Sequence, residues 1–189
     1  MSEVFNIFEI PVLRKKLNID NNKIISYVHK LKKNDTGNSL SNEGGYQSSI
    51  LSKNFDTSLK LLVNDIENIG NEMKEHLNLI GNLKIDSLWA NINEYKDFNK
   101  AHIHSGVFSG VYYVKTPENC GNIVFEHPII DVMNISWKRK LYNKQNSAEW
   151  WLPSEESLLY IFPSWLRHYV KPNLNKEEER ISISFNLSD

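Results

Sequence analysis

Apolar residues in the first half of the chain recur at helical spacing in two segments. Within residues 21–33 they are Ile24, Ile25, Val28 and Leu31, preceded by the candidate N-caps Asp20 and Asn21. Between residues 55 and 80 they form one continuous stripe: Phe55, Leu59, Leu62, Ile66, Ile69, Met73 and Leu77. We therefore predict a short surface helix and a long helix that packs on a core. The polar, glycine-containing residues 34–49 between them predict a loop.

Beyond Gly81 the pattern changes to short β-type runs separated by turn residues. The predicted strands cover residues 83–94, 102–104, 108–115, 122–126, 158–162 and 180–187, with a helix as an option near 131–145. Helices followed by many short strands favour a mainly β fold, a sandwich or barrel with N-terminal helices packed against it. We expect one domain over residues 1–189, with a helical buttress over about 1–81 and a β-barrel core over about 82–189.

Length, charge and cysteine content narrow the function classes. The 189 residues suit a single domain, and 22 Lys and Arg against 23 Asp and Glu give a net charge of -1. We therefore expect no nucleic-acid partner, although the run Lys138-Arg139-Lys140 lies near tryptophans. Cys120, the only cysteine, can form neither an intramolecular disulfide nor a Cys-based metal cluster. Dinucleotide and phosphate-loop glycine motifs are absent.

The chain also lacks the sequence features of membrane or secreted proteins. No apolar run approaches the ~20 residues that span a bilayer. The first ten residues, MSEVFNIFEI, have neither the basic nor the apolar region of a signal peptide. We expect a cytoplasmic protein with no membrane partner.

Two of the six histidines, His102 and His104, are separated only by Ile103. Alternate residues of a strand face the same side, so a strand over 102–104 would let both imidazoles bind one metal ion. The pair alone is a weak signal, because two exposed histidines on a polar strand have the same spacing.

A catalytic metal needs a third protein ligand while other coordination positions stay open. His168 is the best candidate, because it follows the apolar run 158–162 and a turn that begins at Pro163. The alternative interpretation of His168 is a polar turn residue.

The last predicted strand, over residues 180–187, begins with the charged residue Arg180. Alternation over residues 180–186 places Arg180, Ser182 and Ser184 on one face and Ile181, Ile183 and Phe185 on the other. If the apolar face packs on the helices, the polar face lines the barrel interior. A buried guanidinium needs an anionic partner, and its planar fork suits a carboxylate. That carboxylate belongs either to a ligand or to a protein side chain.

Five blocks along the chain complete this picture: residues 42–48 (NEGGYQS), 89–93 (WANIN), 109–114 (SGVYYV), 162–168 (FPSWLRH) and 180–186 (RISISFN). Together they resemble one family of 2-oxoglutarate/Fe(II)-dependent oxygenases that is distantly similar to the prolyl hydroxylases. The resemblance spans nearly the whole chain. It implies a double-stranded β-helix, a jelly-roll or cupin-like barrel with iron and 2-oxoglutarate in its mouth.

The resemblance also implies roles for individual residues. His102 would be the first ligand of the family's H-x-D/E…H motif and His168 the last. Arg180 would bind the distal carboxylate of 2-oxoglutarate, helped by Ser182 and Tyr113. The motif's acidic position is held by His104. The metal site is therefore a triad of His102, His104 and His168, our first choice, or it recruits a carboxylate.

Glu126 is the leading candidate for such a carboxylate, because it ends a neighbouring predicted strand. The resulting hypothesis is a dioxygenase that uses Fe(II), takes 2-oxoglutarate as cosubstrate and hydroxylates an unidentified peptide or small molecule. Ascorbate is a candidate assay additive. The alternative is a non-redox cupin-like barrel that binds a metal or ligand, which would not need a buried Arg180. The sequence leaves the oligomeric state, including a homodimer, open.

Residues 129–154 are too long for a plain hairpin loop. They carry Trp137, Trp150 and Trp151 together with several lysines and an arginine. Such a segment either covers the barrel mouth and grips substrate, or its indoles pack a small satellite core.

Overall fold

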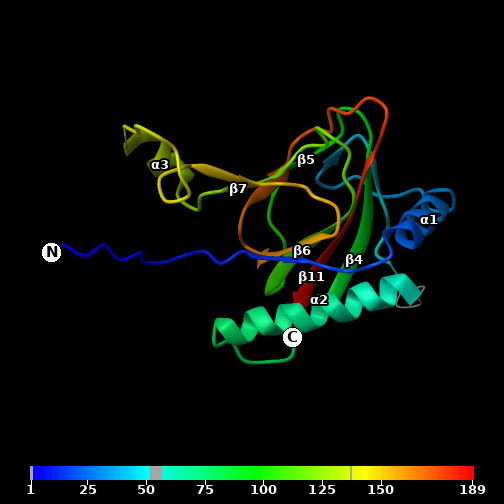
Figure 1. Cartoon of the computed structure of the whole chain (residues 1–189), viewed down its shortest axis with the longest axis horizontal. Helices are drawn as coiled ribbons and strands as arrows, with labels where there is room; N and C mark the ends of the chain where they lie inside the picture. Colours follow the sequence, from blue (N-terminus) through cyan, green and yellow to red (C-terminus); the bar gives the residue numbers. More distant parts are fainter. Residues whose placement is uncertain (1, 52–56, 137) are drawn as a thin grey trace.

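The computed structural model describes residues 2–51, 57–136 and 138–189. Two antiparallel sheets form a double-stranded β-helix (Figure 1). The major sheet has the strand order β1 (Leu13–Lys16), β9 (Leu158–Pro163), β6 (Phe108–Lys115), β11 (Arg180–Ser188), β4 (Lys84–Asn93) and β3 (Tyr46–Gln47). The minor sheet has the order β2 (Asn42–Glu43), β5 (Phe98–His102), β10 (His168–Val170), β7 (Ile123–Glu126) and β8 (Glu149–Leu152).

The helices are α1 (Asn21–Lys32), α2 (Thr57–His76) and α3 (Ile130–Ser136). The apolar stripe of α2 is buried in one cluster with residues of β4, β6, β9 and β11, as the spacing predicted. A Cβ on Gly70 would lie 2.4 Å from Leu187 Cδ1, so the lack of a side chain there allows α2 to approach β11. Phe55, the first residue of the predicted stripe, lies outside the described residues.

A second apolar cluster lies between the two sheets and includes Val111, Tyr160 and Phe162 of the major sheet with Phe125 of the minor sheet. β11 separates the two clusters. Its Ile181, Ile183, Phe185 and Leu187 belong to the cluster on the helix side. Alternation therefore turns Arg180, Ser182 and Ser184 toward the space between the sheets, as the sequence predicted.

Five of the six predicted strands form within one or two residues of their predicted bounds. The strand over 102–104 is wrong, because β5 ends at His102 and His104 lies in the loop that follows. The structure also adds β1, β2 and β3 before residue 81, so this part of the chain contributes strands to both sheets as well as helices. β8 and β10 were not predicted, and α3 is shorter than the optional helix near 131–145.

No helix in the described part of the chain is both long and apolar enough to cross a lipid bilayer.

Candidate metal and cosubstrate site

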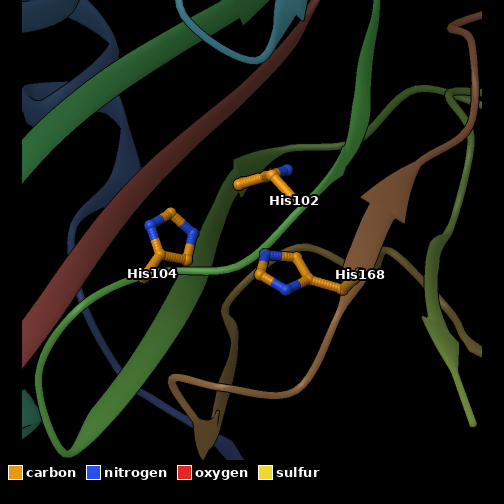
Figure 2. Close-up of side chains that lie close together, drawn as sticks. All are labelled: His102, His104 and His168. Atoms are coloured by element: carbon orange, nitrogen blue, oxygen red, sulfur yellow. The ribbon is translucent and has the colours of Figure 1, made fainter. Parts of the chain in front are cut away.

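Three histidines converge at one end of the space between the sheets (Figure 2). His102 ends β5, His104 lies in the next loop and His168 begins β10 opposite His102. One ring nitrogen from each residue lies within 4.8 Å of the others, a spacing that a single metal ion can bridge. The backbone N–H of His104 donates to the Ser164 carbonyl at 3.0 Å, which ties its loop to the turn before His168.

Backbone carbonyls orient two of the imidazoles. His102 Nδ1 lies 2.6 Å from the Lys100 carbonyl oxygen, and His168 Nδ1 lies 2.9 Å from that of Leu166. Because a carbonyl oxygen can only accept, each Nδ1 carries the hydrogen and each Nε2 presents a lone pair. This second hydrogen bond is the usual way in which a protein fixes a metal-binding histidine.

Burial keeps all three histidines neutral near pH 7. The pKa of His168 is lowered to about 3 and that of His104 to about 4, by burial first and by the neighbouring imidazoles in addition. The pKa of His102 is also lowered, by burial first and by the nearby Arg167 cation in addition. A neutral imidazole is the form that binds a metal. The site therefore needs no deprotonation to accept one at neutral pH.

Glu126, the candidate for a carboxylate ligand, has a different partner. Its Oε2 accepts a hydrogen bond from Arg167 Nε at 2.8 Å. Among the described histidine, cysteine and acidic residues, the group close enough to share a metal contains the three histidines and not Glu126. The geometry therefore favours the three-histidine set.

Arg180 lies in a cage of neutral acceptors. It is 1% exposed, its Nη1 donates to the carbonyls of Cys120, Gly121 and Lys171, and its Nη2 donates to Asn93 Oδ1 at 2.9 Å. Among the described residues no carboxylate forms an ion pair with it, although Asp97 is near enough to raise its pKa. Burial is the larger influence and lowers the pKa of Arg180. The cage orients the guanidinium without neutralising its charge.

The contacts of Arg180 leave one edge of the guanidinium available. Within the described part of the chain, Nε and the second hydrogen of Nη2 have no acceptor. Nε and Nη2 are neighbouring donors on one side of the guanidinium, and a carboxylate can accept from such a pair. Tyr113 is also buried, and its hydroxyl has no hydrogen-bond partner. The Ser154 hydroxyl lies nearby, but the two do not form a hydrogen bond of normal geometry. Burial raises the pKa of Tyr113 to about 12, so its hydroxyl stays a donor.

One cavity joins these groups. The three histidines, Arg180, Tyr113 and Ser182 all line it, whereas the alternative ligand Glu126 is not among its lining residues. Its remaining polar lining consists of amides and hydroxyls: Ser41, Asn91, Asn93, Asn99 and Ser184. A buried cation, an unpaired donor and three neutral imidazoles together suit a divalent metal beside a ligand with two negative charges.

Sequence reasoning missed two residues of β4 that line the cavity. Asn93 accepts from Arg180, and the Trp89 ring lies 5.6 Å from the His104 ring. Both lie on the face of β4 that Asn91 shares, in the block WANIN. Strand alternation, applied to this block as it was to residues 180–186, would have placed them in the barrel.

The prediction that residues 129–154 line the site is wrong. None of the cavity-lining residues comes from this segment, and Figure 1 shows α3 projecting away from the barrel. The satellite-core alternative is not observed either, because Trp150 and Trp151 are exposed. Trp137 lies outside the described residues.

Comparison with known proteins places these features in a family. Residues 87–186 match a family model described as "Putative 2OG-Fe(II) oxygenase", which covers more than half of the chain and all six site residues. No curated protein sequence matches the chain.

Solved structures of low sequence identity share the fold. A Pseudomonas putida prolyl-4-hydroxylase is 12% identical with a TM-score of 0.65, over 94% of this chain and 92% of that one. A viral collagen prolyl hydroxylase from Paramecium Bursaria Chlorella virus-1, in complex with 2-oxoglutarate, is 10% identical with a TM-score of 0.62, over 93% and 94%. A Trichoplax adhaerens prolyl hydroxylase with a hypoxia-inducible-factor peptide is 14% identical with a TM-score of 0.63, over 94% and 83%.

The structural similarities confirm the double-stranded β-helix fold. The family model matches the amino-acid sequence of residues 87–186. The structure adds a cavity with three histidines that could hold a metal ion and an arginine that has no carboxylate partner among the described residues. The chain belongs to the 2-oxoglutarate- and Fe(II)-dependent oxygenase family.

Proposed function

We propose that His102, His104 and His168 hold the Fe(II) of this oxygenase, and that Arg180, Tyr113 and Ser182 bind 2-oxoglutarate. The primary reaction is then hydroxylation of a peptide or small molecule. The observation that carries the proposal is one cavity that holds three neutral imidazoles and a buried guanidinium with a free donor edge.

The metal and cosubstrate supply the oxidising chemistry, in which 2-oxoglutarate and dioxygen yield succinate, carbon dioxide and an oxygen atom for the substrate. The chain's own residues position 2-oxoglutarate and balance its negative charge. Arg180 presents Nε and Nη2 to the distal carboxylate, and the Tyr113 hydroxyl donates to the same group. Ser182, the cross-strand partner of Tyr113, adds a third hydroxyl donor.

Charge balance explains why a site without a carboxylate ligand suits this cosubstrate. The three imidazoles are neutral, so a divalent metal keeps its full charge, and Arg180 adds another positive charge. With the metal bound, a dianion therefore enters a cavity that holds a net positive charge. In a site with an acidic ligand the metal would attract the dianion less strongly.

The non-redox barrel gains no support from Arg180. A barrel that only binds a metal has no use for a caged cation at the far end of the cavity, because burying an unpaired charge is costly. The cage of Asn93 and three backbone carbonyls is explained when a ligand carboxylate completes it.

The test combines binding with turnover. Calorimetry with the protein loaded with Ni(II) or Mn(II) measures 2-oxoglutarate affinity, and succinate is assayed with Fe(II) and ascorbate. We expect binding and slow succinate formation without substrate, and faster formation when a panel of peptides and small molecules includes the substrate. Arg180→Ala should weaken 2-oxoglutarate binding by about 2–5 kcal/mol, and Arg180→Lys should restore only part of it.

Metal affinity is the internal control, because the Arg180 variants should leave it unchanged. A metal-loaded wild-type protein that neither binds 2-oxoglutarate nor forms succinate would contradict the proposed function. Equal 2-oxoglutarate affinity in wild type and Arg180→Ala would leave Arg180 a structural role only.

A further inference from the structure

Two apolar surfaces outside the barrel lack a partner. The first is the N-terminal segment 2–9, which we name the tail. Its large apolar residues are almost fully exposed, with Phe8 at 95% and Val4 at 91%, and Phe5 and Ile7 are also exposed. No hydrogen bond joins the tail to the rest of the described chain. Exposed apolar groups at this density usually mark an interaction site.

The second surface is the segment 129–152, which we name the arm. It contains α3 and β8, and its exposed apolar side chains lie on these elements and on the residues beside them: Ile129, Val132, Leu141, Tyr142, Trp150 and Trp151. β8 is the outermost strand of the minor sheet and pairs only with β7 among the described strands. Its other edge offers unpaired backbone groups to a further strand.

The two surfaces carry opposite charge. The tail holds Glu3 and Glu9 and no basic side chain. The arm holds three exposed lysines, Lys138, Lys140 and Lys144, none of which forms an ion pair with the described residues. Arg139 is engaged within the arm, where it lies over the Tyr142 ring. The tail is therefore acidic and the arm has a net positive charge, since its lysines and Arg139 outnumber Asp131 and Glu149. The arm's lysines lie in residues 138–144, before β8, and β8 itself carries Glu149.

Geometry allows the tail to serve as the missing strand. Eight extended residues reach about 26 Å, and a four-residue strand such as β8 spans about 13 Å. In Figure 1 the tail and the arm extend from the same side of the barrel. Ile10 and Val12, just after the tail, pack on the cluster between the sheets and anchor it to the body.

We propose that the tail of one copy adds to the open edge of β8 in a second copy, and that the second copy returns its own tail to the first. The exchange gives a closed two-fold dimer in which each copy donates and receives one strand. It covers the apolar side chains of both surfaces and pairs the tail glutamates with the arm lysines. This inference does not depend on the chemistry of the cavity.

Charge reversal on each surface provides the test. The full chain is examined by size-exclusion chromatography with light scattering and by sedimentation, as wild type, as the tail variant Glu3→Lys/Glu9→Lys, and as the arm variant Lys140→Glu/Lys144→Glu. We expect a dimeric wild type and a dissociation constant at least tenfold higher in either variant alone. An equimolar mixture of the two variants should form heterodimers of near wild-type affinity, because both exchanged contacts then join opposite charges.

Low ionic strength should tighten the wild-type dimer and weaken self-association of each variant. Circular dichroism checks that the variants keep their fold, which is expected for exposed side chains. A wild-type chain that stays monomeric into the high micromolar range would overturn the proposal. So would a dimer that neither charge reversal weakens, or a mixture that forms no heterodimer, because the tail would then lie elsewhere or on its own arm.

Discussion

The two ends of the cavity are built on different sheets, and they hold their functional groups in different ways. The histidine end, where we propose that the metal binds and which we call the metal end, draws His102 and His168 from β5 and β10, strands of five and three residues, and His104 from a loop. The Arg180 end lies on β11, a nine-residue strand paired on both sides along most of its length. One backbone carbonyl orients each of His102 and His168, whereas three backbone carbonyls and Asn93 Oδ1 together surround Arg180.

This difference predicts different responses to change. At the metal end, function depends on which side chains are present, and the fold depends on them little. At the Arg180 end, the guanidinium joins the carbonyls of two separate loops to β4 through Asn93, so its surroundings are part of the backbone structure. Substitutions can therefore separate metal affinity, cosubstrate affinity and stability.

The largest effect is expected at the metal end. His168→Ala or His104→Ala removes one of three ligands and should lower metal affinity by more than about 100-fold, beyond the usual effect of an outer-shell residue. Glu126→Gln is the matched control and should leave metal affinity unchanged, because Glu126 pairs with Arg167. Titration with Mn(II) or Ni(II) measures both. Loss of metal binding in Glu126→Gln, with binding retained in His104→Ala, would restore the carboxylate alternative.

A backbone change should act on the other end through stability. Gly121 has a φ of 84°, and a Cβ there would lie 2.1 Å from the Lys171 carbonyl oxygen, one of the Arg180 acceptors. Gly121→Ala should therefore lower the free energy of unfolding by about 1–3 kcal/mol. Denaturant unfolding of the metal-free protein measures it. An unchanged midpoint would show that the cage adjusts more easily than its contacts indicate.

Asn93→Asp tests the neutrality of the cage with almost no change of shape. A carboxylate in place of the amide oxygen that accepts from Arg180 Nη2 would neutralise part of the guanidinium charge. We expect 2-oxoglutarate affinity to fall about tenfold, close to 1.4 kcal/mol, while metal affinity and stability hold. Asn99→Asp, another amide on the cavity wall, is the comparison variant. If Asn99→Asp lowered 2-oxoglutarate affinity more than Asn93→Asp, the total charge of the cavity would matter more than direct contact of the new carboxylate with Arg180.

The smallest effect concerns pH. The pKa values of His104 and His168, about 4 and about 3, and the lowered pKa of His102 keep protons from competing with the metal near neutrality. Metal affinity should change less than about twofold between pH 7 and 8 and fall steeply below about pH 5, where protonated imidazoles lose their lone pair. A metal titration at several pH values measures this. A steep loss already between pH 7 and 6 would show that the metal-free site is open to water.

Strand alternation accounts for much of what the sequence could predict. It placed Arg180, Ser182 and Ser184 on the inner face of β11, because residues 181, 183 and 185 are uniformly apolar. The same rule gave the right neighbours for the wrong reason at His102 and His104. They meet because the chain leaves β5 at His102 and the next loop turns His104 back, held by the Ser164 carbonyl.

The short strands and the cage of Arg180 depend on contacts between segments that are distant in the sequence. Local sequence patterns contain no information on such contacts. β1, β8 and β10 are short strands whose pairing depends on neighbours far away in the sequence. The cage of Arg180 joins Asn93, Cys120, Gly121 and Lys171, which no spacing rule connects. Asn93 also has an ordinary role as a strand residue opposite Arg180, so its type alone gave no signal.

The cage has a consequence for control of the reaction. On the proposed assignment, Arg180 and Tyr113 contact only the distal carboxylate, which 2-oxoglutarate keeps when it loses its other carboxylate and becomes succinate. This end of the cavity therefore holds cosubstrate and product by the same contacts, and discrimination between them rests on the metal end alone. Succinate should compete for the site, and the rate in a cell would follow the ratio of the two dicarboxylates as well as the supply of substrate.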